Sequence, residues 1–245
     1  MTPPKPGARE TRPGGSAAKP GARDTKPGGS AAGPGASTAK AGVRAAKAAQ
    51  TRARMLAAAR DLFVGRGYTA TSMQAIATEA GVAVQTLYFT FETKRAILKE
   101  LLDIEVAGDD APVATLDRPW VAEALAAPPE ELLRRLAEAT TGIHARVAAL
   151  LEVVRSAAAT DAEIAELWDT NIAQRHTVLA VFTGALAAKQ ALRPGLNALR
   201  AADAALAVLA PETYRLLTRH RGWSDRAWAD WAAETLIDTL LARSE

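Results

Sequence analysis

Residues 84–90, VQTLYFT, carry side chains that can read the edges of base pairs. The amide of Gln85 can form a bidentate pair with adenine, and the methyl group of Val84 or Thr86 can contact a thymine methyl. If the stretch is helical, Leu87 faces the protein interior. The side chains left to point outward are Val84, Gln85, Thr86, Tyr88 and Thr90. This pattern favours contact with DNA, provided that neighbouring elements hold the helix in place.

The other reactive residue types show no catalytic or metal-binding spacing. The chain has no cysteine, which excludes a disulfide framework, a cysteine nucleophile and a thiolate metal site. Its histidines, His144, His176 and His220, lie far apart, and none belongs to an H-E-x-x-H pattern. No glycine motif follows a strand pattern, so a dinucleotide site is not indicated. We therefore expect no enzyme activity, no cofactor and no metal.

Helical patterns surround residues 84–90 on both sides. One runs from about residue 45 to Arg66, a second follows the N-cap residues Thr71 and Ser72, and a fourth runs from Thr93 to about residue 106. The second and third are joined by a three-residue turn that starts at Gly81, where a helix end favours positive φ. This arrangement is a helix-turn-helix, whose second helix enters the major groove. Helix pairs with a glycine turn also occur in proteins without a DNA role, so spacing alone leaves both interpretations open.

The segment at residues 55–98, MLAAARDLFVGRGYTATSMQAIATEAGVAVQTLYFTFETKRAIL, closely resembles the N-terminal domain of TetR-family transcriptional regulators. The matching residues are Ala58-Ala59, Leu62-Phe63, Gly67-Tyr68, Thr71-Ser72, Ile76-Ala77, Ala80-Gly81-Val82, Thr86-Leu87-Tyr88, Phe91 and Lys94. They occur in order and without gaps. The resemblance implies a homodimer that binds a palindromic double-stranded DNA operator, usually as a repressor. It also implies a helical C-terminal domain that binds a small-molecule effector and forms the dimer interface.

The resemblance further implies roles for individual positions. Residues matching Tyr88 and Lys94 contact phosphate, and a residue matching Thr71 or Ser72 does the same from the second helix. The positions that commonly face the bases are those of Val84, Gln85, Thr86 and Thr90.

Two residues depart from the family pattern. Ala83 stands where a capping Ser or Thr is frequent, and loss of such a cap costs about 1 kcal/mol. Phe89 is large and apolar where many relatives are polar, so it either packs against the first helix or contacts a sugar or a thymine methyl. Near the start of the first helix, Arg52 and Arg54 are either solvated or in contact with backbone phosphate.

The C-terminal half shows only helical patterns, so we expect an all-α fold: an N-terminal three-helix helix-turn-helix domain plus a C-terminal helical ligand-binding and dimerisation domain. After a linker at about residues 108–119, one helix starts near Pro129, with an interruption at Gly142. Another follows Asp161, and Asn197 caps a helix that continues to about residue 219 with a kink at Pro211. The last helix follows residue 224.

Polar and aromatic residues within these apolar helices are candidates for a ligand pocket, since pockets need a few such groups among apolar walls. The candidates are Trp120, His144, Glu152, Arg155, Trp168, Asn171, His176 and Tyr214. Each could equally be a paired surface or core residue. On the last helices Trp228, Trp231 and Leu241 are dimer candidates, with an intramolecular core position as the alternative. The helix from Thr93 joins both domains and is expected to transmit ligand binding to the DNA-binding helix.

Charge divides the chain unevenly. Residues 1–50 contain nine Lys or Arg and two acidic residues, whereas the whole chain has a net charge of only +3. Residues 5–18 and 19–32 are near-identical Pro/Gly-rich repeats without large apolar side chains, which predicts disorder. This basic tail is either an electrostatic arm for DNA or a solvated segment without a role. A sequence-nonspecific DNA-binding protein driven by this tail is the alternative function.

The expected domains are a disordered tail at residues 1–48, a DNA-binding domain at 49–109 and an effector-binding and dimerisation domain at 110–245. No stretch approaches the roughly 20 apolar residues that a bilayer-spanning helix needs. The first 30 residues also lack the apolar core of a secretory signal. We therefore expect a cytoplasmic protein without membrane association.

Overall fold

The computed structural model describes residues 34–108 and 113–242, with side chains described from residue 42. Residues 45–245 form one compact unit. The first helix, α1, begins before it and spans Pro34–Arg66. The sequence prediction of disorder up to residue 48 differs from the structure at residues 34–48, where six of the fifteen residues are alanine, a strong helix former. The two Pro/Gly repeats lie outside the described residues.

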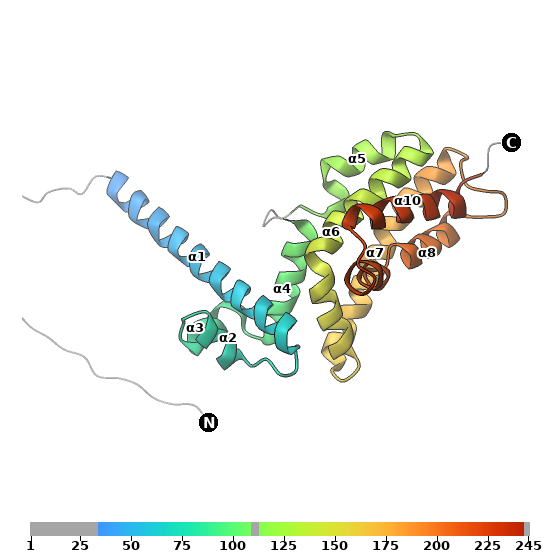
Figure 1. Cartoon of the computed structure of the whole chain (residues 1–245). Helices are drawn as coiled ribbons and strands as arrows, with labels where there is room; N and C mark the ends of the chain where they lie inside the picture. Colours follow the sequence, from blue (N-terminus) through green and yellow to red (C-terminus); the bar gives the residue numbers. More distant parts are fainter. Residues whose placement is uncertain (1–33, 109–112, 243–245) are drawn as a thin grey trace, which may run out of the picture. The chain divides into compact units, whose positions relative to one another are not determined.

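Three further helices complete the N-terminal part of the fold (Figure 1). These are α2 (Met73–Glu79), α3 (Val84–Phe91) and α4 (Lys94–Ala107). The hydroxyls of Ser72 and Thr93 accept hydrogen bonds from the third backbone N–H of α2 and α4, as the sequence indicated. Gly81, at φ +65°, makes the turn between α2 and α3, a conformation that side chains with a Cβ rarely adopt. The expected helix-turn-helix is thus present.

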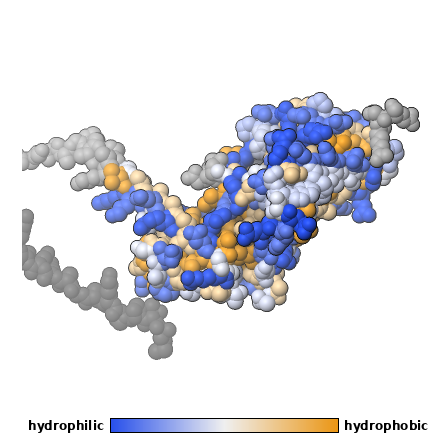
Figure 2. Space-filling model, in the orientation of Figure 1, coloured by the Kyte–Doolittle hydropathy of each residue, from blue (hydrophilic) through white to orange (hydrophobic). Residues whose placement is uncertain are grey.

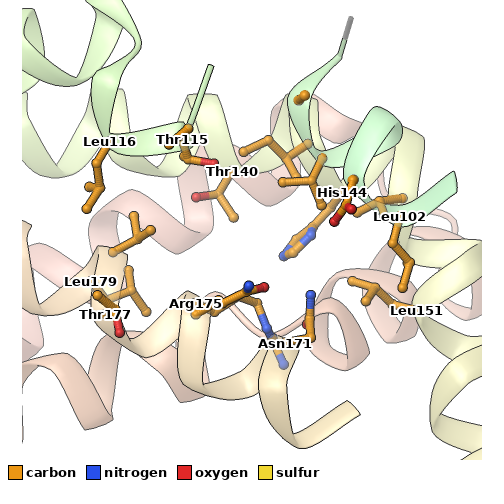
Figure 3. Close-up of a pocket in the computed structure, with 18 of the residues that line it drawn as sticks. Leu102, Thr115, Leu116, Thr140, His144, Leu151, Asn171, Arg175, Thr177 and Leu179 are labelled. Atoms are coloured by element: carbon orange, nitrogen blue, oxygen red, sulfur yellow. The ribbon is translucent and has the colours of Figure 1, made fainter. Parts of the chain in front are cut away.

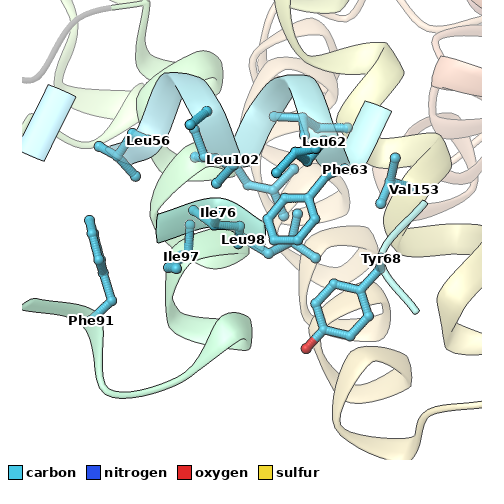
Figure 4. Packing of buried hydrophobic residues seen from close by; sticks show 14 of the residues in the cluster. Leu56, Leu62, Phe63, Tyr68, Ile76, Phe91, Ile97, Leu98, Leu102 and Val153 are labelled. Carbon is cyan, nitrogen blue, oxygen red and sulfur yellow. The ribbon is translucent and has the colours of Figure 1, made fainter. Parts of the chain in front are cut away.

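A continuous apolar core holds α3 in place (Figure 4). Phe63 of α1, Ile76 of α2, Leu87 of α3 and Leu98 of α4 have no exposed surface. Val153 belongs to the same cluster although it comes from a helix that lies much later in the chain. Core residues therefore fix both the recognition helix and its connection to the C-terminal helices.

The C-terminal part is also helical throughout the residues that the structure describes. It contains a 3₁₀ turn at Thr115–Asp117 followed by α5 (Pro119–Ala126), α6 (Pro129–Ala158), α7 (Ala162–Ala188), α8 (Ala198–Val208), α9 (Pro211–Arg215) and α10 (Asp225–Leu240). The all-α prediction is confirmed. Between α9 and α10, residues Leu216–His220 form a π-helical turn. None of the described helices is long and apolar enough to cross a membrane.

Three details of the C-terminal prediction were wrong. Gly142 does not interrupt its helix, because α6 continues through it for 30 residues. The linker expected at about residues 108–119 is followed directly by α5, a helix that was not predicted and whose first residue is a proline that suits this position. Pro211 starts a new helix instead of kinking a continuous one, because its ring cannot supply the N–H that a helix interior needs.

The expected boundary at residues 109/110 does not separate two cores. Leu101 and Leu102 of α4 pack in the same apolar cluster as Val147 and Leu151 of α6 and Leu167 of α7. A second cluster lies among α5, α6, α7, α8 and α10. The DNA-binding and C-terminal helices are therefore joined by packed side chains as well as by the chain itself.

Candidate nucleic-acid interface and ligand cavity

The recognition helix α3 presents most of its predicted contact residues to solvent. Gln85 and Thr86 are exposed, Tyr88 is 50% exposed and Phe89 is 92% exposed. Val84 and Thr90 are half-buried, and the Thr90 hydroxyl donates to the Thr86 carbonyl. The packing alternative for Phe89 is wrong in this structure, because the ring contacts none of the core. A large apolar ring held in solvent beside Gln85 suits contact with sugar or thymine methyl groups.

The pair Thr71 and Ser72, expected to supply a phosphate contact, divides into two roles. Thr71 is 2% exposed, and its hydroxyl donates to the carbonyl oxygens of Gly67, at 2.8 Å, and Leu62. The Thr71 side chain therefore stabilises the loop before α2, and its burial leaves almost no surface for the predicted DNA contact. Ser72 is exposed at the N-terminus of α2, where free backbone N–H groups also favour an anion.

Lys94 has an internal role in addition to the expected phosphate contact. Its ammonium donates to the carbonyl oxygens of Tyr68 and Thr71, each at 2.8 Å, and lies 4.0 Å from the centre of the Tyr68 ring. Burial lowers the pKa of Lys94, while Asp161 acts in the opposite direction. Lys94 therefore joins the start of α4 to the loop before α2. Its third N–H remains for a phosphate oxygen.

The side chain of Arg52 forms contacts with other residues of the protein. Its guanidinium donates to both carboxylate oxygens of Glu100 on α4, at 2.8 and 2.5 Å, and lies 4.5 Å from the centre of the Phe91 ring. Arg52 therefore links α1 to α4 and is not freely solvated, while its side chain, 43% exposed, leaves the expected phosphate contact a prediction. Arg54, one of the other basic residues of α1, is exposed.

A strained turn connects the recognition helix to α4. Glu92 has φ 60° and ψ −52°, and the Thr93 N–H donates to the Phe91 carbonyl at 2.5 Å. This is a γ-turn with positive φ, which is rare for a residue with a side chain. Backbone in this region costs about 1–3 kcal/mol, and such strain occurs frequently at functional sites. The turn fixes the end of α3 relative to α4.

A cavity of about 610 Å³ lies among α4, α5, α6, α7 and α8 (Figure 3). Its walls are mostly apolar, with contributions from Leu102 and Val106 of α4, Ile143 of α6 and Leu179 of α7. The volume lies within the range of small-molecule sites. Because α4 contributes both to this cavity and to the core beneath α3, it has contacts at both sites.

Three of the eight predicted pocket residues line this cavity: Trp120, His144 and Asn171. Glu152 and Arg155 instead pair with each other at 2.7 Å on an exposed helix face, beside a small crevice that also includes Trp168. These three residues do not line the main cavity.

The other two pocket candidates also lie outside the cavity. His176 pairs with Asp203 of α8 at 3.2 Å. Tyr214 stands behind His144, with its ring 5.5 Å from the imidazole and its hydroxyl donating to Asp225 at 2.6 Å. Burial and the contact with Asp225 raise the pKa of Tyr214. The polar atoms of His176 and Tyr214 therefore have partners within the protein.

Several polar residues of the cavity wall were not predicted from the sequence, among them Arg175, Gln174, Thr140 and Thr170. For Arg175, the sequence contains a pattern from which its place in the cavity could have been predicted. It follows Trp168 and Asn171 at i+7 and i+4, which places all three on one helix face, the face that carries Leu179 and Phe182 toward the interior. A charged residue on an otherwise inward stripe indicates a site.

Burial dominates the electrostatics of His144. It is 3% exposed, and burial lowers its pKa to about 4. Its Nε2 lies 2.9 Å from the Leu209 carbonyl oxygen, which can only accept, so Nε2 carries the proton. The other nitrogen, Nδ1, is buried without a partner in the described residues. His144 is therefore a neutral ring with one free acceptor.

The dimer candidates have different positions. Trp228 has no exposed surface and packs against Tyr214 and His144, so its assignment to an interface is wrong and the core alternative is correct. Its indole belongs to the second core cluster together with several alanines of the surrounding helices. Trp231 and Leu241 are half-buried at the edge of the second core cluster. Figure 2 shows hydrophobic patches among hydrophilic ones on one face of the molecule.

Comparisons with known proteins agree with this geometry. Residues 55–101 match the family model described as bacterial regulatory proteins, tetR family. Comparison with curated proteins gave no match.

Among solved structures, a protein described as a transcriptional regulator from Saccharomonospora viridis, in complex with choline, is 23% identical, with 80% of this chain and 100% of that chain covered and a TM-score of 0.62. The MbdR regulator from Azoarcus sp. CIB is 18% identical, with coverage of 78% and 100% and a TM-score of 0.60. NalD, the secondary repressor of the MexAB-OprM multidrug efflux pump in Pseudomonas aeruginosa, is 20% identical, with coverage of 78% and 97% and a TM-score of 0.57. At these sequence identities, the similarity shows a shared fold over most of the chain.

Proposed function

We propose that this chain, whose residues 55–101 match the family model of bacterial regulatory proteins of the tetR family, is a ligand-responsive transcriptional repressor. It binds a palindromic operator as a homodimer through α3 and is released when a small molecule occupies the cavity. The observation that carries the proposal is the outer face of α3, where Gln85, Thr86, Tyr88 and Phe89 are exposed while Leu87 anchors the helix.

The dimer follows from the geometry of DNA. One recognition helix of eight residues covers few base pairs, whereas two-fold pairing presents two helices about one helical turn of DNA apart, or a multiple of it. Trp231 and Leu241 remain available for such an interface. Leu199 on α8, which is 65% exposed, is a further apolar residue for it.

Release by ligand requires coupling between the cavity and α3. α4 lines the cavity through Leu102, Asp103 and Val106, and about one turn earlier it packs Ile97 and Leu98 into the core that holds α3. Arg95 of α4 also lies 3.6 Å from Glu166 of α7. A ligand that favours one position of α4 would therefore shift the distribution of recognition-helix positions in the dimer. To change occupancy strongly it must discriminate between the two states by several kcal/mol.

The ligand of the Saccharomonospora viridis protein, choline, is not carried over to this chain. The cavity here contains a guanidinium, Arg175, for which the described residues supply no ion-pair partner. A quaternary ammonium would add a second positive charge to the same apolar space, which is unfavourable.

Selection of bound DNA from a random pool tests the proposal. We expect an enriched palindrome, and we expect Gln85→Ala to relax the preference at one position of each half-site, because a bidentate pair with adenine contributes about 1–3 kcal/mol of discrimination. Gln74→Ala, an exposed amide on α2, is the matched control and should keep the preference. Failure of the wild-type chain to enrich any sequence would contradict the proposal.

A further inference from the structure

The cavity contains one cation for which the described part of the chain provides no counter-charge. The Nε of Arg175 is buried without a hydrogen-bond acceptor, and the guanidinium lies 5.6 Å from the centre of the Trp168 ring. Burial lowers the pKa of Arg175, and Glu212 acts in the opposite direction without forming an ion pair. Arginine remains protonated in proteins. A buried charge without a partner is costly, so an anion in the cavity would stabilise the folded protein.

The other charged residues of the described cavity wall do not supply that anion. Lys99 and Asp103 of α4 both line the cavity, but they pair with each other at 2.6 Å and neutralise each other's charge. The net charge of the described wall is therefore one positive charge, at Arg175. A ligand with a single negative charge balances it, whereas a phosphate monoester, with about two charges, would leave an excess in an apolar site.

Two buried acceptors complete the polar end of the cavity. The Nδ1 of His144 and the Oδ1 of Asn171 have no partner in the described residues. The side chains of His144 and Asn171 point toward each other from α6 and α7 (Figure 3). Asn171 lies one helical turn before Arg175, and Figure 3 shows the side chains of His144, Asn171 and Arg175 around the same part of the cavity. Two unsatisfied acceptors require a donor on the ligand.

The rest of the wall is apolar and extends away from this polar end. Leu102, Val106, Val147 and Leu151 contribute aliphatic surface, and Trp120 lies stacked on Phe182, 5.9 Å between ring centres. This surface suits an apolar body attached to the anionic group.

We propose that the cavity binds an amphipathic monocarboxylate that carries a hydroxyl or amide N–H close to its carboxylate. The carboxylate pairs with the planar guanidinium of Arg175, the hydroxyl or N–H donates to His144 or Asn171, and the apolar body contacts the aliphatic wall. This inference deepens the proposed function, since it names the chemical class of the effector.

Binding to the full chain, measured by isothermal titration calorimetry, tests the proposal with ligands of matched length. The probes are 3-hydroxydodecanoate, dodecanoate, dodecanamide and dodecyltrimethylammonium, with 4-phenylbutanoate and 4-phenylbutanamide as an aromatic pair. We expect dodecanoate to bind about ten to a hundred times more tightly than dodecanamide, and 4-phenylbutanoate more tightly than 4-phenylbutanamide by the same factor, as for a hydrogen bond to a charged group. The hydroxy acid should bind more tightly than dodecanoate, and the ammonium should bind more weakly than any carboxylate.

Substitution of Arg175 identifies the group responsible. Arg175→Met should remove the preference for the carboxylate over the amide while leaving the amide affinity within about threefold. Arg135→Met, on the exposed face of α6 where Arg135 pairs with Glu131, is the matched control and should keep the preference. Asn171→Leu should reduce the advantage of the hydroxy acid alone. Thermal unfolding of each variant verifies folding, and the wild-type comparison of acid with amide decides the proposal even if a variant fails to fold.

Equal affinity for acid and amide in both wild-type pairs, a preference for the ammonium, or a carboxylate preference that persists in Arg175→Met would overturn the inference. Operator binding is measured separately on the same preparations. Intact operator binding without carboxylate preference contradicts the ligand class alone. Conversely, a carboxylate that binds through Arg175 and leaves operator affinity unchanged supports the ligand class and contradicts release by ligand.

Discussion

At the scale of single residues, the site consists of side chains whose burial decides their role. Thr71 and Arg52 match positions or types that could contact DNA, but one is buried and the other is paired with Glu100. Gln85 and Phe89 stay free in solvent. Sequence patterns identify which residue types are present, whereas burial and pairing depend on long-range packing that one sequence does not display.

The buried His144 predicts a specific dependence of stability on pH. Its pKa is about 4 in the folded protein against 6.5 for an ordinary histidine. Between these pH values only the unfolded chain takes up the proton, so acidification favours unfolding. We expect this residue to remove about 3 kcal/mol of stability between pH 7 and pH 4. Urea unfolding of wild type and His144→Gln should show a steeper loss in the wild type, and parallel curves would contradict the assignment.

Lys94 predicts effects on both stability and DNA binding. Lys94→Met leaves the carbonyl oxygens of Tyr68 and Thr71 without their donor, which should cost about 1–2 kcal/mol because the site is half-buried. Denaturant unfolding measures this loss, and Lys99→Met, on the exposed side of α4, should stay within about 0.5 kcal/mol of wild type. If the remaining N–H contacts phosphate, affinity should fall for all DNA sequences alike and the salt slope should decrease by about 1. An unchanged salt slope would restrict Lys94 to its structural role.

At the scale of elements, the order and ends of the helices around α3 were predictable because caps and glycines act locally. Ser72, Gly81 and Thr93 were identified from the sequence and have the expected roles. Errors arose where packing overrides local preference, as at Gly142, which α6 accommodates. The cavity was only partly predictable, because Trp168 and Arg175 share a helix face but only Arg175 lines it.

The γ-turn at Glu92 predicts that glycine stabilises the connection between α3 and α4. Glu92→Gly removes the strain of positive φ and should raise the free energy of unfolding by about 1 kcal/mol after the greater chain entropy of glycine is subtracted. Glu79→Gly, at the exposed end of α2, is the control and should lower stability. Thermal or urea unfolding measures both. A loss of stability in Glu92→Gly as large as in the control would show that the turn carries no strain.

At the scale of the whole molecule, one continuous core joins the recognition helix to the ligand cavity through α4. In the function that we propose, this arrangement would couple ligand binding to DNA binding. The fold class and the DNA-binding segment were accessible from one sequence because they rest on a dense local motif. The dimer interface could not be predicted from the sequence, since Trp228 is of a type that suits an interface but lies in the core.

Removal of residues 1–33 separates the role of the basic tail from that of α3. This segment contains six Lys or Arg and two acidic residues, and the first helix starts directly after it. We expect the truncated chain to bind all DNA more weakly and with a smaller salt dependence, while it retains the order of preference among sequences. Fluorescence anisotropy at several salt concentrations measures both quantities. Loss of the sequence preference itself would favour a nonspecific binder driven by the tail.

The most direct test of α3 as the reading element is a photo-crosslink from its outer face. p-Benzoylphenylalanine in place of Phe89, the most exposed apolar side chain of the helix, reports which atoms of the operator lie within reach. The account predicts crosslinks to bases at two positions related by the symmetry of the palindrome, and none from the same residue placed at Val64 on the outer side of α1. Crosslinks scattered along the DNA, or absent from position 89, would contradict it.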